Sequence, residues 1–302
     1  MSSEVAVDGG ALRVLRFGAG RATVLAAHGI TASGMAFGAV ARHLPRGWTM
    51  LAPDLRGRGH SARLPGPYGL ARHVGDVCAV AERHAAGRQG GPGGPVVLAG
   101  HSMGAFVALL AAAARPDLFA RLVLIDGGLP LPLHDGASGP DTDLDQRLDA
   151  TLGPAIARLS QTFSDQRAYL DFFRAHPALG PHWNADVEAY VAYDLTGPPG
   201  AMRSRVQPDA VRQDGRELLA GAARFAAALH ELAMPALVLT APGGMFGDPP
   251  GFMPPPLVRQ WRAELPDLHA ELVADSNHYT ILLSPAAAAL VARRLTDPAS
   301  WP

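Results

Sequence analysis

The sequence of 302 residues contains no lysine, so all 26 of its basic residues are arginines. A chain without lysine cannot form a Schiff base through a lysine amine, and it cannot contain the lysine of a Walker phosphate-binding loop. Cysteine is nearly absent too, because Cys78 is the only one. No disulfide can form within the chain, and we interpret Cys78 as a residue of helix packing.

Neither sign of charge predominates, since the formal net charge is -1. This balance gives no broad positive field for nucleic acid and no cationic helix for a membrane surface. The longest apolar run, residues 104–114, is too short to cross a bilayer, and the N-terminus MSSEVAVDGG does not resemble a secretory signal. We expect a cytoplasmic protein that acts on a small molecule, without a nucleic-acid or membrane partner, as a monomer or homodimer.

Short runs of valine, leucine and isoleucine alternate with longer segments of helical spacing in the first half of the chain. They predict strands over 5–7, 12–17, 23–27, 49–52, 96–99 and 122–125, and helices over 35–44, 70–86 and 103–114. Several of these strand runs lack polar alternation, as do strands that are buried on both faces. The pattern predicts an α/β fold with a mainly parallel sheet and helices on both faces.

The pattern changes after residue 128. Residues 129–232 contain no convincing buried strand and predict a helical insertion. Strand character returns at 236–240 and 269–273, and a last helix is expected over 284–295. The sequence therefore predicts one core domain, residues 1–128 and 233–302, interrupted by a helical cap. Proline and glycine predict loops at 87–95 and 241–256.

The segment Gly100-His-Ser-Met-Gly104 connects a predicted buried strand directly to a predicted helix. A turn this sharp puts Ser102 in a strained backbone conformation, and the two glycines avoid side-chain clashes around it. The hydroxyl then stands at the carboxyl edge of the sheet, above a helix N-terminus that favours a developing anion. Ser102 is the predicted nucleophile, against the alternative of an ordinary helix cap.

A serine nucleophile needs a base, because its hydroxyl is hardly ionised at neutral pH. Among twelve histidines, His278 is the only one that follows the final predicted strand, on a loop at the sheet edge where Ser102 lies. The third group must be a carboxylate that orients the imidazole. Asp126, at the end of the strand run LVLID, is the preferred candidate; Asp248 is the alternative acid and Asp275 a weaker third.

The segment His28-Gly29-Ile30 follows the third predicted strand and is expected to supply an oxyanion hole. Glycine allows the backbone to turn the Ile30 amide toward the reacting carbonyl, and the Met103 amide supplies a second donor.

Five segments together resemble the alpha/beta-hydrolase superfamily, in its cap-bearing, esterase-like branch: HGI at 28–30, PDLRGRGHS at 53–61, GHSMG at 100–104, LVLIDGG at 122–128 and NHYTI at 277–281. The resemblance implies an eight-stranded sheet whose second strand is antiparallel, with residues 129–232 as a lid. Most relatives carry the acid after the seventh strand, where no carboxylate stands at 243–245 here. A minority carry it after the sixth strand, which is the position of Asp126.

The resemblance implies hydrolysis rather than dehalogenation or epoxide opening, because those relatives use an aspartate nucleophile. We expect a serine hydrolase that cleaves a carboxylic ester or lactone through an acyl-enzyme. The alternatives are an acyltransferase or cyclase, a carbon-carbon bond hydrolase, and a receptor-like protein of low turnover.

Several further side chains are candidates for contact with an apolar substrate. They are the two histidines of the motifs and aromatic residues of the insertion, namely His28, His101, Phe163, Trp183 and Tyr190. No metal is expected, because HELAM at 230–234 lacks the second histidine of a zinc helix. No cofactor is expected, because no glycine-rich segment has the spacing of a dinucleotide loop.

Overall fold

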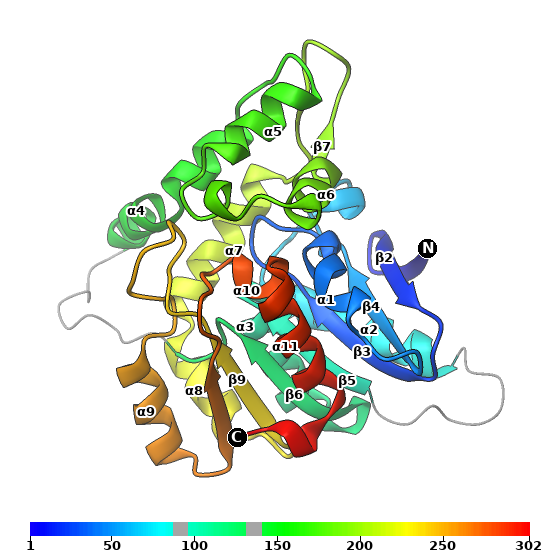
Figure 1. Ribbon diagram of the computed structural model, residues 1–302, viewed down its shortest axis with the longest axis vertical. Coiled ribbons are helices and arrows are strands. Elements are labelled where there is room, and N and C mark those ends of the chain that lie inside the picture. The colour runs from blue at the N-terminus through cyan, green and yellow to red at the C-terminus, as the bar shows by residue number, and fades with distance from the viewer. Residues whose placement is uncertain (87–95, 131–140) are drawn as a thin grey trace.

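The computed structural model describes residues 1–86, 96–130 and 141–302 (Figure 1). The loop predicted at 87–95 lies outside this part of the chain. Three strands open the chain, and from residue 22 onward strands and helices alternate through the first half, as the apolar pattern predicts.

The core of the molecule is an eight-stranded sheet in the order β1-β2-β4-β3-β5-β6-β9-β10. Only β2 runs against its neighbours, and all other pairs are parallel. This confirms the predicted sheet and its antiparallel second strand. The strands are β1 Ser2–Val7, β2 Gly10–Gly18, β3 Ala22–Ala27, β4 Trp48–Pro53, β5 Val96–His101, β6 Phe119–Ile125, β9 Ala236–Thr240 and β10 Leu268–Leu272.

Helices cover both faces of the sheet because the central strands are apolar on both sides. Alternate side chains of β3, β5 and β6 enter two separate apolar clusters. One cluster packs the sheet against α2 (Leu70–Ala86), α3 (Met103–Ala114), α8 (Ala222–His230) and α9 (Pro255–Glu264). The other packs it against α1 (Gly38–Arg42), α10 (Thr280–Leu283) and α11 (Pro285–Thr296).

The segment between β6 and β9 is mainly helical, and α4, α5 and α6 lie over one end of the sheet (Figure 1). Its helices are α4 (Asp141–Leu159), α5 (Gln166–Arg174), α6 (Ala185–Tyr193), α7 (Pro208–Ala220) and α8. A two-stranded ribbon, β7 (Leu195–Thr196) with β8 (Arg203–Ser204), also occurs there, which the sequence did not predict. Helix α8 packs on the core helix α3. We call this segment the cap; its role as a lid and its boundaries at 129 and 232 stay predictions.

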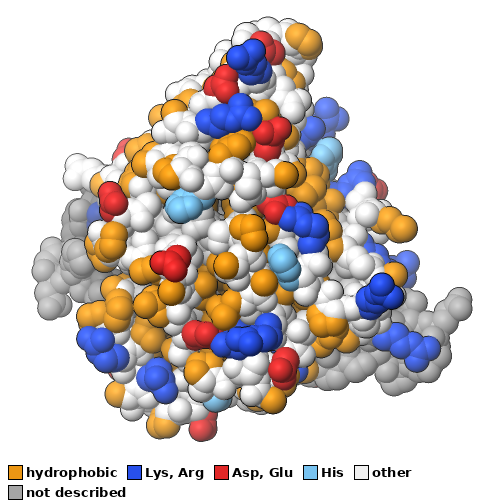
Figure 2. Space-filling model, in the orientation of Figure 1, with side chains coloured by type: hydrophobic (Ala, Val, Ile, Leu, Met, Phe, Trp, Pro, Cys, Tyr) orange, Lys and Arg blue, Asp and Glu red, His pale blue; other side chains and the backbone are white. Residues whose placement is uncertain are grey.

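Arginine and acidic side chains are interspersed on the face of the molecule in Figure 2. Within the described residues, no helix combines the length and apolar character needed to cross a membrane.

Candidate active site

Ser102 stands on the turn between β5 and α3 with φ 55° and ψ -124°, a conformation that costs energy for a residue with a side chain. Glycine is required on both sides of it because a side chain there would clash with the backbone. A Cβ atom on Gly100 would lie 2.0 Å from the carbonyl oxygen of Gly104, and one on Gly104 would lie 2.1 Å from the carbonyl oxygen of Ala27. These observations confirm the predicted strained turn.

The structure brings Ser102, His278 and Asp126 together in one hydrogen-bonded series. The Nε2 atom of His278 lies 3.0 Å from the Ser102 hydroxyl oxygen, and its Nδ1 atom lies 2.7 Å from Oδ2 of Asp126. Asp126 is fully buried, and its Oδ1 accepts a hydrogen bond from the Ala241 amide. Because the carboxylate accepts a hydrogen bond from the protonated Nδ1, Nε2 carries no proton and can accept the one on the serine.

Neither of the other acid candidates belongs to this series. Asp248 and Asp275 are both exposed, and the carbonyl of Asp248 accepts a hydrogen bond from the Gly244 amide. Among the described residues, the only carboxylate hydrogen-bonded to His278 is that of Asp126. The geometry therefore agrees with the preference for Asp126 over Asp248.

Ile30 and Met103 both line the cavity in front of Ser102. The carbonyl of Gly29 accepts a hydrogen bond from Nδ1 of His28 at 2.8 Å. A trans peptide directs its carbonyl and its N–H to opposite sides, so this bond turns the Ile30 N–H away from His28. Met103 is the first residue of α3, where N–H groups have no carbonyl one turn earlier. The two amides keep their predicted role as oxyanion donors.

The prediction that His28 contacts substrate is wrong. Its ring is fully buried and does not line the cavity, because Nε2 accepts a hydrogen bond from the Leu55 amide while Nδ1 donates to Gly29. Burial lowers the pKa of His28 to about 3, so the ring stays neutral. The sequence could not separate this supporting role from contact with substrate, since both require a histidine beside the oxyanion segment.

His101, a predicted candidate for contact with substrate, lies in the cavity wall. Its Nε2 donates to the carbonyl of His278 at 2.7 Å, which ties the loop of the base to the strand of the nucleophile. Burial, together with His278, lowers the pKa of His101 well below its usual range. A neutral ring that donates from Nε2 supports His278 without adding charge to the site.

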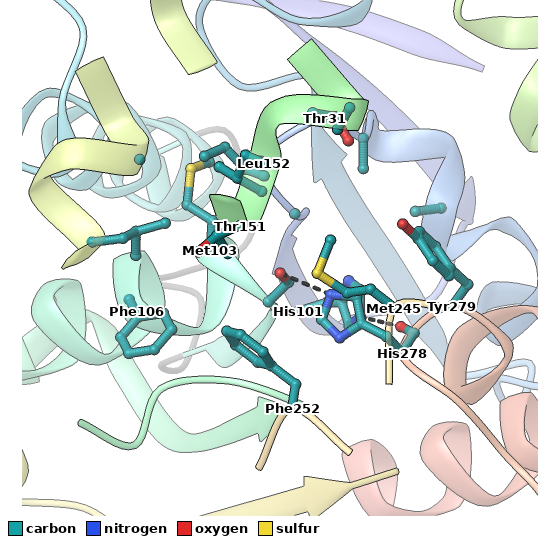
Figure 3. Close-up of a pocket in the computed structure, with 18 of the residues that line it drawn as sticks. Thr31, His101, Met103, Phe106, Thr151, Leu152, Met245, Phe252, His278 and Tyr279 are labelled. Atoms are coloured by element: carbon teal, nitrogen blue, oxygen red, sulfur yellow. Dashed lines mark hydrogen bonds between the residues drawn. The ribbon is translucent and has the colours of Figure 1, made fainter. Parts of the chain in front are cut away.

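The cavity has a volume of about 130 Å³ and a mostly apolar wall. Met103 and Phe106 come from α3, Leu152 from α4, and Met245 and Phe252 from the loop after β9 (Figure 3). The ring of Phe252 stands edge-on to His278, with the centroids 5.3 Å apart. An apolar wall around the imidazole and hydroxyl suits an uncharged acyl group next to the reacting bond.

Of the three cap aromatics predicted to contact substrate, only Tyr190 lines the cavity. Phe163 packs edge-on against Tyr169, and Trp183 lies under Arg174 while its indole N–H donates to Glu188. The predictions for Phe163 and Trp183 are therefore wrong. Spacing marks such residues as apolar, but the packing of the cap decides which of them reach the cavity.

A second buried histidine-carboxylate pair joins the cap to the core. Asp214 on α7 lies 2.6 Å from Nη1 of Arg58 and 2.9 Å from Nε2 of His73, and it accepts a hydrogen bond from the Gly69 amide. Burial raises the pKa of the Asp214 carboxyl, but Arg58 and His73 lower it more, to about 2. Arg58 also donates from Nε to the carbonyl of Ile30.

The segment DLRGRGHS at 54–61 turns the chain and also contains two buried arginines. Gly57 and Gly59 do adopt positive φ there, at 79° and 48°, but the arginines of this segment are buried and paired. A buried arginine needs a carboxylate partner, but the sequence alone does not show that these arginines are buried. Within the described residues, no group of three or more histidine, cysteine or acidic side chains is placed to hold a metal ion.

Comparison with known proteins agrees with this geometry. A model of the alpha/beta hydrolase family matches residues 24–293. Lipase LipV of Mycobacterium tuberculosis is 41% identical over 121 residues, which make up 40% of this chain and 43% of the lipase. The match therefore spans less than half of that relative's length.

Solved structures share the fold at lower identity. E-2-(acetamidomethylene)succinate hydrolase superposes with a TM-score of 0.77 at 22% identity, over 98% of this chain and 99% of that one. The thioesterase domain from the curacin biosynthetic pathway superposes with a TM-score of 0.73 at 20% identity, over 98% of each chain. The hypothetical protein PA1622 from Pseudomonas aeruginosa gives 0.69 at 25% identity, over 97% of this chain and 95% of that one.

Proposed function

Because the chain belongs to the alpha/beta-hydrolase family, we propose that it is a serine hydrolase that cleaves a carboxylic ester or lactone of a small, largely apolar molecule. The observation that carries the proposal is the series of hydrogen bonds from Asp126 through His278 to Ser102. The apolar wall of the cavity supports an apolar body for the substrate.

The reaction follows from the two nitrogens of His278. Nε2 accepts the proton of Ser102 as the serine oxygen attacks the carbonyl carbon, and Asp126 stabilises the resulting imidazolium. The amides of Ile30 and Met103 bind the oxygen on which negative charge develops. His278 then returns the proton to the leaving alcohol, and a water molecule, activated in the same way, releases the acid from Ser102.

The test is the Ser102→Ala variant with p-nitrophenyl esters of graded acyl length. We expect its turnover number to fall at least about ten thousandfold, because removing the nucleophile leaves only binding and the oxyanion donors. An organophosphate should phosphorylate Ser102 of the wild type with loss of its leaving group, which adds the mass of the phosphoryl group, and the variant should gain no mass.

Ser160→Ala is the matched control, since Ser160 is exposed on the cap. Turnover that survives in Ser102→Ala would reject the proposal. A wild type that retains a ligand tightly without forming product would also reject the proposal. A product whose mass shows an acceptor other than water would indicate acyl transfer.

A further inference from the structure

A second cavity of about 140 Å³ adjoins the one in front of Ser102. The two share wall residues, among them Thr31, Tyr190 and Tyr279. The second cavity extends from the oxyanion segment under the cap, and its far wall includes Arg158 and Asp194. A substrate held at Ser102 can therefore extend from an apolar space into one that contains a guanidinium.

Arg158, in the last turn of α4, has a side chain that is only 9% exposed. Its Nη1 donates to the Tyr169 hydroxyl at 2.9 Å and lies 3.5 Å from Oδ2 of Asp194, while its Cζ stands over the Phe173 ring. Within the described residues, Nε and Nη2 make no hydrogen bond, and neither atom is fully shielded. Two donors of a buried cation thus remain available to the cavity.

Asp194 does not use these donors. Its Oδ2 already accepts from the Tyr169 hydroxyl at 2.6 Å and the Ser204 hydroxyl at 2.6 Å, and its Oδ1 accepts from the Arg205 amide. The carboxylate is therefore held by the cap itself. It meets Arg158 on one nitrogen only, at the long end of a hydrogen bond.

Ser33 adds an independent observation in the same cavity. It follows the oxyanion segment, lines the second cavity, and is 1% exposed. Its hydroxyl has no hydrogen-bond partner in the described part of the chain. Buried donors are normally satisfied, so an unpaired hydroxyl and an incompletely paired guanidinium in one cavity indicate an acceptor group that the protein does not supply.

We propose that this cavity binds a carboxylate of the substrate against Arg158, so that the preferred substrate carries its reacting carbonyl at one end of an acyl chain and a carboxylate at the other. This inference rests on the proposed function, and it defines the substrate class as half esters of dicarboxylic acids. A planar guanidinium with two adjacent free donors matches the two oxygens of a carboxylate.

The test compares two series of p-nitrophenyl esters of equal chain length. The mono-esters of succinate, glutarate and adipate carry the carboxylate; the butanoate, pentanoate and hexanoate esters lack it. We expect wild-type kcat/KM to favour the charged member by about tenfold at the best length, since a hydrogen bond to a charged group supplies about that discrimination. A ratio of one or less at all three lengths would overturn the proposal.

The Arg158→Met variant should lose about ten- to a hundredfold in kcat/KM for the charged esters, mainly through KM, and stay within about twofold for the neutral ones. Arg167→Met, an exposed arginine of α5, is the matched control and should leave both series unchanged. Equal losses for both series would overturn the inference. If Arg158→Met does not fold, Arg158→Lys should give an intermediate preference for the charged esters. Lysine keeps the positive charge but lacks the two adjacent donors of the guanidinium.

A wild type that hydrolyses neither series would count against the proposed function, and binding then tests the cavity by itself. Calorimetric titration of the wild type with glutarate and with adipate should show binding. The Arg158→Met or Arg158→Lys variant should bind both more weakly. The absence of binding to wild type, or equal binding to the variants, would overturn the carboxylate site.

Discussion

Within the described part of the chain, two buried histidine-carboxylate pairs have nearly equal distances. Asp126 lies 2.7 Å from His278 at the edge of the sheet, and Asp214 lies 2.9 Å from His73 where the cap meets the core. Both carboxylates are fully buried. The pairs differ in what surrounds them, and that difference separates a candidate catalytic base from a structural contact.

The free nitrogen of the histidine is the first difference. Nε2 of His278 faces the Ser102 hydroxyl in a cavity, whereas Nδ1 of His73 is buried and has no partner among the described residues. Charge is the second difference, because Arg58 lies 2.6 Å from the Asp214 carboxylate, but no arginine within the described residues pairs with Asp126. A histidine-carboxylate pair can serve catalysis only when its second nitrogen reaches a reacting group.

The largest expected effect is the difference in turnover number between variants of the two carboxylates. Asp126→Asn should lower kcat about ten thousandfold, because an asparagine stabilises the wrong tautomer of His278. Asp214→Asn should stay within about tenfold of wild type in the folded fraction, since it does not contact the reacting atoms. Steady-state assays with a p-nitrophenyl ester, with circular dichroism as a check of folding, measure both.

Asp248→Asn is the matched control, because it is the exposed alternative acid, and it should leave turnover unchanged. A collapse in Asp248→Asn with an active Asp126→Asn would show that the hydrogen bond at His278 does not identify the acid.

The second expected effect concerns stability, for which the Asp214 pair should matter more than the Asp126 pair. Asp214→Ala should lower the free energy of unfolding by about 3–5 kcal/mol, because it removes the carboxylate that pairs with the buried Arg58. Urea unfolding monitored by fluorescence measures it. Asp209→Asn, an exposed residue of the same helix, should change stability by less than about 1 kcal/mol. Equal effects of the two variants would show that the buried network adds nothing to cap docking.

The sequence was sufficient to predict the parts of the site that depend on where a strand ends and a turn begins. Ser102 follows from one turn between a buried strand and a helix, and Asp126 and His278 follow from their places after strands of a parallel sheet. Parallel strands end at one edge, so residues far apart in sequence meet there.

The cap could not be predicted in the same way. Phe163 and Trp183 have the same apolar character as Tyr190, but only the packing of α5 and α6 decides that Tyr190 alone of the three lines the cavity. Arg158 reads as a surface residue of an amphipathic helix until α4 is placed against Tyr169 and Asp194. Side-chain pairing between separate helices carries no signal in a single sequence, which also explains why Asp214 was missed.

A third effect uses pH to distinguish the pairs. The pKa of Asp214 is about 2 in the folded protein against 3.8 as its ordinary value, so the ionised form stabilises the fold above pH 4. That contribution, on the order of 2 kcal/mol, should be lost as the pH falls from about 4 through 2. Urea midpoints measured between pH 5 and pH 2 should fall more steeply in wild type than in Asp214→Asn. Parallel curves would assign the acid sensitivity to other groups, among them the buried neutral His28.

The smallest expected effect tests how the supporting contacts reach the reacting atoms. His28 and Arg58 hold consecutive carbonyls, those of Gly29 and Ile30. In His28→Asn the shorter side chain cannot bond both Gly29 and Leu55, so the Ile30 amide should lose part of its alignment. Complete loss of an oxyanion donor costs about a hundred- to a thousandfold, and partial misalignment should cost about tenfold in kcat with KM little changed. A boronic acid that mimics the tetrahedral intermediate should bind His28→Asn weaker by the same factor, whereas the exposed His60→Asn should change neither value. A fall in kcat with unaltered boronate affinity would place the effect of His28 in general packing rather than in the oxyanion segment.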